Sequence, residues 1–92
     1  MCGICGVLNF DGTPVTLENL NQINDQMIMR GPDDSGHYIK DNFGMAMRRL
    51  SIIDMDSGHQ PIANSNGTIN VVFNGEIYNY IELRKKLEQK GY

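Results

Sequence analysis

The chain has 92 residues, 21% of them charged, and a formal net charge of −3 at pH 7, so it is long enough for one domain with a small core. It has no basic cluster and no apolar run near ~18 residues, which argues against nucleic-acid binding through phosphates and against a membrane span. Its start shows no basic stretch followed by an apolar one, so we expect no secretory signal, a cytoplasmic location and two reduced cysteines.

The first third of the chain predicts a strand followed by an amphipathic helix. Residues 7–10 favour a strand, and Asp11-Gly12 is typical of a tight turn. Thr16 is a good N-cap, and the helix after it should end at Arg30, because Gly31-Pro32 breaks helices. The apolar stripe of this helix, which we expect to pack on a sheet, consists of Leu17, Leu20, Ile23, Met27 and Ile28.

The middle of the chain predicts two strands between loops. Residues 33–36 indicate a polar loop, and residues 37–40 and 43–47 indicate two strands joined by a short turn. Residues 50–54 fit a short strand or an extended loop. Residues 57–67 are rich in Gly, Ser, Asn and Pro, which is typical of a loop.

The last third predicts one strand and one helix. Residues 68–73 are rich in β-branched side chains and form the strongest predicted strand of the chain. Asn79 followed three residues later by Glu82 has the pattern of a capping box, and Gly91 should cap the other end of that helix. The elements together predict an α+β fold with two helices and mostly antiparallel sheets.

Cys2 is the most informative residue for function, because it becomes the N-terminal residue if Met1 is removed. An N-terminal cysteine combines a nucleophilic thiol with a free α-amine, and an α-amine of ordinary pKa, about 7.7–8.0, can act as a base near neutral pH. A cysteine near a chain start is more often inert, so the case depends on residues elsewhere.

The spacing Cys2-Gly3-Ile4-Cys5 leaves two other interpretations open, because a C-x-x-C pair can be a redox dithiol or half of a zinc site. A redox pair favours a cysteine at the start of a helix, whereas a strand-like run follows here. A zinc site needs further ligands, and the chain offers only His37 and His59, in separate segments.

Four short segments stand out together: MCGICG at residues 1–6, RGPDDSG at 30–36, RLSIID at 49–54 and FNGEIYN at 73–79. In this order they resemble the N-terminal glutaminase domain of class II glutamine amidotransferases, in the asparagine synthetase (glutamine-hydrolysing) branch. The resemblance extends over essentially the whole chain. It implies the Ntn-hydrolase fold, a four-layer αββα sandwich, of which this chain would supply part of both sheets.

The resemblance implies that Cys2 attacks the side-chain amide of glutamine and forms a thioester, while its own α-amine moves the proton. It assigns the oxyanion hole to the side-chain N–H of Asn74 and the backbone N–H of Gly75, which would also contact the bound glutamine. Taken alone, Asn74-Gly75 would rather indicate a hairpin turn.

The resemblance also implies a site for the amino-acid end of glutamine. Arg49 would hold the α-carboxylate, since its planar fork matches a carboxylate, and Glu76 would help bind the α-ammonium. The backbone after Arg49 would line the site, through Leu50, Ser51, Ile52 and Ile53.

Neighbouring residues are expected to have lesser roles. Arg30 and Asp33 would order a loop beside the nucleophile, and Arg48 would be a solvated strand arginine. His37 and His59 would be ordinary surface or loop histidines, and we expect no metal in this chain.

The departure from the family is length. Relatives of this type hold the glutamine amine with a further acidic residue downstream and are usually followed by a synthetase domain. We therefore expect residues 1–92 to be a truncated glutaminase domain, without a synthetase domain and with little or no activity alone. In the full-length form, ammonia would reach a synthetase domain that activates aspartate with ATP and Mg²⁺, and a homodimer is one expected state.

Two other functions stay open. The chain could be the glutaminase part of a related amidotransferase with another ammonia acceptor. It could also be a non-catalytic fragment or binding module that keeps Met1, which would block the α-amine of Cys2.

Overall fold

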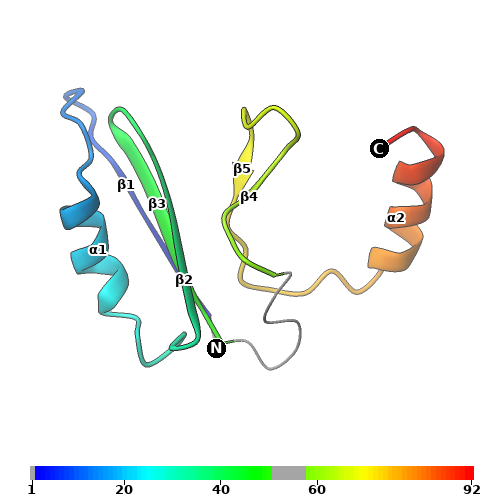
Figure 1. The fold of residues 1–92 in the computed structure, drawn as a ribbon, viewed down its shortest axis with the longest axis horizontal. Helices are drawn as coiled ribbons and strands as arrows, with labels where there is room; N and C mark the ends of the chain where they lie inside the picture. The colour runs from blue at the N-terminus through cyan, green and yellow to red at the C-terminus, as the bar shows by residue number, and fades with distance from the viewer. Residues whose placement is uncertain (1, 51–57) are drawn as a thin grey trace.

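The computed structural model describes residues 2–50 and 58–92, and these ranges contain two helices and five strands. Figure 1 shows how these elements are arranged. In chain order they are β1 (Gly3–Leu8), α1 (Leu17–Asp25), β2 (Asp34–Lys40), β3 (Phe43–Arg49), β4 (Ile62–Ala63), β5 (Asn70–Val71) and α2 (Tyr80–Gln89). No helix in the described part of the chain is long and apolar enough to cross a membrane.

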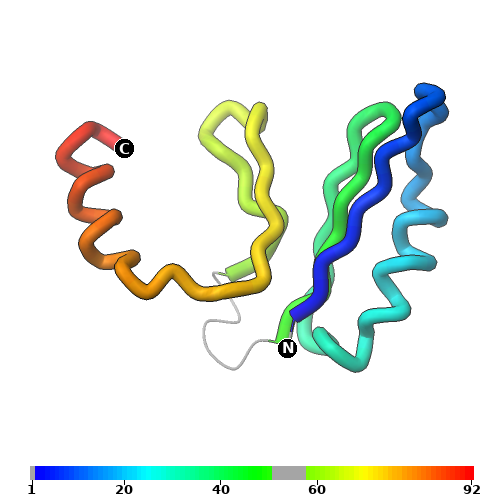
Figure 2. The backbone as a smooth tube through the Cα atoms, turned by 180° about the vertical axis from the view of Figure 1, so that it is seen from behind, coloured from blue at the N-terminus to red at the C-terminus, as the bar shows by residue number. Residues whose placement is uncertain are grey.

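The strands form two antiparallel sheets. The first has three strands in the order β1-β3-β2, and its register sets Gly3 opposite Arg48. The second is the pair β4-β5, in which Ile62 lies opposite Val71. Figures 1 and 2 show α1 on one side of the three-stranded sheet, the β4-β5 pair on the other side and α2 beyond that pair. The α+β prediction is confirmed, in the partial αββα order implied by the resemblance.

The core lies between α1 and the three-stranded sheet. It is built from buried Val15, Leu20 and Ala46, with Cys5, Val7 and Ile39 packed against them. Side chains alternate along a strand, so Ala46 and Arg48 face α1 while Met47 and Arg49 belong to the opposite face of β3. This alternation separates the two adjacent arginines and gives them different surroundings.

Helix α1 starts as predicted but ends early. The Thr16 hydroxyl accepts a hydrogen bond from the Asn19 N–H at 3.2 Å, which confirms the N-cap. The helix ends at Asp25, and residues 26–30 form turns instead, closed by bonds such as Arg30 N–H to the Met27 carbonyl at 2.9 Å. Of the predicted stripe only Leu20 is fully buried, because a three-stranded sheet is too narrow to cover the rest.

Four strand predictions need correction. Strand β1 covers Gly3–Leu8, so it lies earlier than the predicted residues 7–10, because it follows β3 in an antiparallel ladder that begins at Gly3. Strand β2 begins at Asp34, so most of the predicted 33–36 loop is strand, because pairing with β3 outweighs weak local propensity. The predicted 57–67 loop contains β4. The predicted 68–73 strand pairs only at Asn70–Val71, because its partner β4 is equally short. The alternative predictions for 50–54 fall mostly on residues 51–57, outside the described residues.

Helix α2 follows Asn79, but the predicted capping box is wrong. The Asn79 side chain makes no cap hydrogen bond, because its backbone (φ −100°, ψ 30°) is not in the extended conformation that an N-cap needs. The other end is as predicted. Gly91 has φ +90°, and the N–H groups of Gly91 and Tyr92 donate to the Glu88 and Leu87 carbonyls, both at 3.0 Å. This is the Schellman pattern of a helix end.

Candidate active site

The candidate site forms around Cys2, which immediately precedes β1. The side-chain amide of Asn74 donates to the Cys2 carbonyl oxygen at 3.1 Å, and Arg30 Nε donates to the same oxygen at 3.4 Å. Three residues from the separate motifs at the start, at 30–36 and at 73–79 therefore meet at one atom. Arg30 therefore lies beside Cys2, as the sequence predicts, whereas the role of Cys2 as nucleophile stays a prediction.

A shallow pocket of about 330 Å³ opens at this meeting point. Its lining consists of Cys2, Gly3, Ile4, Met27, Arg30 and Asn74. Gly3 brings the backbone of β1 close to the turns at residues 26–30 that follow α1, since a Cβ added to Gly3 would lie 2.7 Å from the Met27 sulfur. The pocket thus brings together Cys2, a cationic side chain and an amide donor, with Ile4 and Met27 completing its lining.

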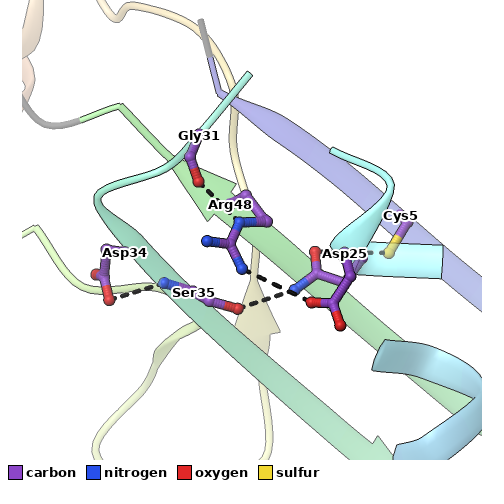
Figure 3. A network of polar contacts seen from close by, with 7 residues as sticks. Cys5, Asp25, Gly31, Asp34, Ser35 and Arg48 are labelled. Carbon is purple, nitrogen blue, oxygen red and sulfur yellow. Dashed lines mark hydrogen bonds and ion pairs between the residues drawn. The ribbon is translucent and has the colours of Figure 1, made fainter. Parts of the chain in front are cut away.

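Gly31 and Arg48 hold the loop that carries Arg30 against β3 (Figure 3). A Cβ on Gly31 would lie 2.5 Å from the Arg49 backbone nitrogen, so only glycine allows this approach to β3. Arg48 Nε donates to the Gly31 carbonyl at 2.8 Å, and Arg48 lies 3.8 Å from the Asp25 carboxylate. The prediction that Arg48 is solvated is wrong, because its side chain faces α1 and is 12% exposed.

Asn24 is a structural residue that the sequence analysis missed. It is 1% exposed, and its amide nitrogen donates to the Ser35 hydroxyl at 2.9 Å. Its oxygen faces the Cys5 thiol at 4.0 Å. Asn24 therefore connects α1 with β1 and β2. The available signal was a polar residue at helical spacing from buried Leu20, since a buried amide needs hydrogen-bond partners.

The segment between β5 and α2 carries Asn74 and Gly75, and it is not a hairpin. Residues 72–79 lead from a strand into a helix, and Gly75 lacks the positive φ that a type I′ turn would require. Gly75 lies against the ring of Phe73, where an added Cβ would approach the ring to 2.8 Å. Glu76 is on the same segment and is exposed.

Arg49 ends β3 next to the start of β1, since the register continues from Gly3 opposite Arg48. It is buried, 6% exposed, and its Nη1 lies 3.8 Å from the Asp34 carboxylate. Gly58 covers the guanidinium, because a Cβ there would come within 2.7 Å of Nη1. Arg49 does not line the pocket beside Cys2. Leu50 follows it and is 39% exposed, whereas Ser51, Ile52 and Ile53 lie outside the described residues.

Asp34 connects Arg49 with His59, whose Nδ1 lies 2.8 Å from the same carboxylate. Burial by itself would raise the pKa of Asp34. The hydrogen bonds from His59 and the Ser35 N–H, with the charges of His59 and Arg49, together lower that pKa. His59 is exposed as expected, but its ring nitrogen is held against the Asp34 carboxylate at the edge of the site.

The strand conformation overturns the redox interpretation of Cys2 and Cys5. Residues 3–5 are extended, so two residues three apart have Cα atoms about 10 Å apart, beyond the ~7 Å limit for a disulfide. Burial also raises the pKa of Cys5, which faces the core side of the sheet. Among residues 2–50 and 58–92, no three His, Cys, Asp or Glu side chains gather as metal ligands would.

The profile of the glutamine amidotransferase domain family matches residues 1–92. Asparagine synthetase [glutamine-hydrolyzing] 1 of Bacillus subtilis is 45% identical, covering 100% of this chain and 15% of that protein. Asparagine synthetase [glutamine-hydrolyzing] 1 of Arabidopsis thaliana is 43% identical, covering 96% of this chain and 15% of that protein. A putative asparagine synthetase [glutamine-hydrolyzing] 2 of Methanocaldococcus jannaschii is 37% identical, covering 94% of this chain and 20% of that protein. The chain therefore spans about a sixth of the length of these relatives.

Proposed function

Because the chain belongs to the glutamine amidotransferase domain family, we propose that it hydrolyses the side-chain amide of glutamine with Cys2 as the nucleophile. The observation that carries the proposal is the hydrogen bond from Asn74 to the Cys2 carbonyl, which joins residues 72 positions apart. An amide donor beside a cysteine with its own amine supplies the groups that acyl transfer needs.

The proposed first step forms a thioester and releases ammonia. The α-amine of Cys2, freed by removal of Met1, takes the thiol proton as sulfur attacks the amide carbon of glutamine. The carbonyl oxygen becomes an oxyanion, which the side-chain N–H of Asn74 and the backbone N–H of Gly75 stabilise. The C–N bond then breaks as the α-amine returns the proton to the departing nitrogen.

The second step hydrolyses the thioester. Water attacks the same carbon, the α-amine takes a proton from it, and the C–S bond breaks to give glutamate and the thiol. The Asn74 amide nitrogen carries two hydrogens, so one can hold the Cys2 carbonyl while the other serves the oxyanion. Arg49 and Glu76 are proposed to hold the α-carboxylate and α-ammonium of glutamine, with the backbone of residues 50–53 beside them.

The use of the ammonia is also a proposal. The relatives named above are asparagine synthetases, which supports transfer to aspartate in a longer protein. A synthetase domain outside residues 1–92 would bind ATP and Mg²⁺ for that step. The cytoplasmic location, the homodimer and the low activity of residues 1–92 alone stay predictions.

The test is glutamine turnover in the full-length protein, measured as glutamate released. Cys2→Ala should abolish it, while Cys5→Ala, a matched cysteine on the core side of the sheet, should retain it in the folded protein. Turnover that survives in Cys2→Ala would overturn the proposal. An inactive protein whose N-terminal peptide still begins with Met1 would favour the binding-module interpretation.

A further inference from the structure

We infer that Gln60 is a positioning residue for this reaction, which aligns Asn74 with Cys2 by pairing its side-chain amide with the backbone of Phe73. The inference rests on the proposed glutaminase function for its catalytic readout. Its geometry stands on three contacts that lead from the first sheet to the candidate oxyanion hole.

The first contact is a two-point pairing between Gln60 and Phe73. The Phe73 N–H donates to Gln60 Oε1 at 2.7 Å, and Gln60 Nε2 donates to the Phe73 carbonyl at 3.2 Å. A carboxamide has one acceptor and one donor side by side, so it can take the place of a neighbouring strand's peptide group. Gln60 thereby satisfies both backbone groups of the residue that precedes Asn74.

The register of the second sheet explains why a side chain is needed there. Ile62 lies opposite Val71, so a continued antiparallel ladder would set Pro61 opposite Val72 and Gln60 opposite Phe73. Proline has no N–H to donate, and the ladder stops at Ile62. The Gln60 side chain therefore continues the pairing at its own register position, where the backbone ladder has ended.

The second contact anchors Gln60 to the first sheet. Gly36 of β2 is buried, and a Cβ added to it would collide with the Gln60 carbonyl oxygen and lie 2.9 Å from the carbonyl carbon. The backbone of Gln60 thus lies directly on β2, which pairs with β3 along its whole length. This strand is a firmer support than the 72–79 segment, which has no ladder of its own.

The third contact links Phe73, through Asn74, to the candidate active site at Cys2. Asn74 follows Phe73 directly, and its amide nitrogen is 3.1 Å from the Cys2 carbonyl oxygen. An oxyanion donor must be held in place before the reaction, and misplacement by about 1 Å can cost roughly 100-fold in rate. Loss of the Gln60 pairing should therefore reduce kcat through Asn74, with the binding of glutamine little affected.

The experiment is a double-mutant cycle in the full-length protein, with kcat and KM for glutamine measured for each variant. Gln60→Ala should lower kcat by about tenfold or more with KM nearly unchanged. Gln60→Glu keeps the shape but sets a carboxylate oxygen against the Phe73 carbonyl, so it should be at least as slow. Gln22→Ala, an exposed glutamine on α1, is the matched control and should behave as wild type.

The cycle separates positioning from general damage. If Gln60 acts through Asn74, then Gln60→Ala should add almost nothing to the loss caused by Asn74→Ala. The inference would be overturned if the losses in kcat of the two single variants multiplied in the double variant. It would also be overturned if Gln60→Ala changed only KM.

A second measurement does not depend on activity. Hydrogen exchange at the Phe73 amide should accelerate in Gln60→Ala and remain slow in Gln22→Ala, and unchanged exchange would overturn the pairing. If turnover proves independent of Cys2 while this exchange result holds, then the proposed function has failed and the geometry of the Gln60 pairing has not.

Discussion

The side-chain amide of Asn74 lies 3.1 Å from the carbonyl oxygen of Cys2, and this hydrogen bond ties the segment before α2 to the first strand of the other sheet. Arg30 donates to the same oxygen from a third segment. The bond sets an N–H donor next to the residue whose thiol would attack. In the proposed reaction, this bond would hold the Asn74 amide beside Cys2 as a donor to the oxyanion.

Removal of the Asn74 donor should slow the chemical step. Asn74→Ala is expected to lower kcat for glutamine by about 100- to 1000-fold, with a smaller effect on KM, because loss of one oxyanion donor costs ~2.7–4 kcal/mol. Asn74→Asp keeps the shape but replaces the donor with a carboxylate, so it should be equally slow. Steady-state kinetics on the full-length protein make the measurement.

The matched control for that prediction is Asn70→Ala. Asn70, the first residue of β5, also donates from its side chain to a backbone carbonyl, that of Gly67 at 3.1 Å, away from Cys2. Its loss should leave kcat near the wild-type value. Equal losses in the Asn74 and Asn70 variants would contradict a catalytic role for Asn74.

Substitution of Arg49 should weaken glutamine binding. Arg49→Lys keeps the charge near Asp34 but loses the planar fork, so KM for glutamine is expected to rise roughly 10- to 100-fold with kcat less affected. Arg84→Lys is the control, since Arg84 is exposed on α2 and lies 5.9 Å from the Tyr80 ring. A normal KM in a folded Arg49→Lys protein would exclude a role in holding the carboxylate.

Asp34 should make the protein sensitive to acid. The folded state lowers the pKa of Asp34, so its ion pairs stabilise the protein above the ordinary aspartate pKa of about 3.9, and this stability is lost as pH falls through the lowered value. Asp34→Asn should therefore have a lower Tm than wild type near pH 6. The difference should shrink as the pH falls below about 4. A Tm difference between wild type and Asp34→Asn that grows as the pH falls would contradict this prediction.

The approach of Gly31 to β3 predicts a steric requirement for glycine. Gly31→Ala sets a Cβ into the backbone of Arg48 and Arg49, and it should destabilise the fold by about 1–3 kcal/mol. Gly6→Ala is the comparison, because a Cβ there would meet the Gly44 carbonyl oxygen at an ordinary 3.4 Å. Thermal unfolding of both variants makes the test, and equal Tm values would contradict the close packing of Gly31 on β3.

Local signals in the sequence predicted local structure well. The Thr16 cap and the Gly91 helix end depend on a few neighbouring residues, and both were predicted correctly. The Asn79 cap was wrong because the backbone of Asn79 is not extended, and the pattern of Asn79 and Glu82 carries no sign of that conformation. The motifs at Cys2, Arg30 and Asn74 were predicted to belong together, and the fold brings them to one oxygen atom.

The features that sequence reasoning missed all depend on contacts between distant segments. Arg48 and Arg49 are identical in type, and only the register of β3 decides which one faces α1. Asn24 is buried because β1 and β2 supply its hydrogen-bond partners. Gln60 gains its role from a ladder that stops two residues away, at Ile62, and no periodicity in the sequence reveals where that ladder ends.

The measurement that tests the central claim most directly is the mass of the N-terminal peptide, taken from the full-length protein quenched in acid during glutamine turnover. The account predicts a peptide that begins at Cys2 and carries a γ-glutamyl group as a thioester, released by hydroxylamine and lost in Cys2→Ala. A glutamyl group on Cys5, or turnover in protein that retains Met1, would contradict it.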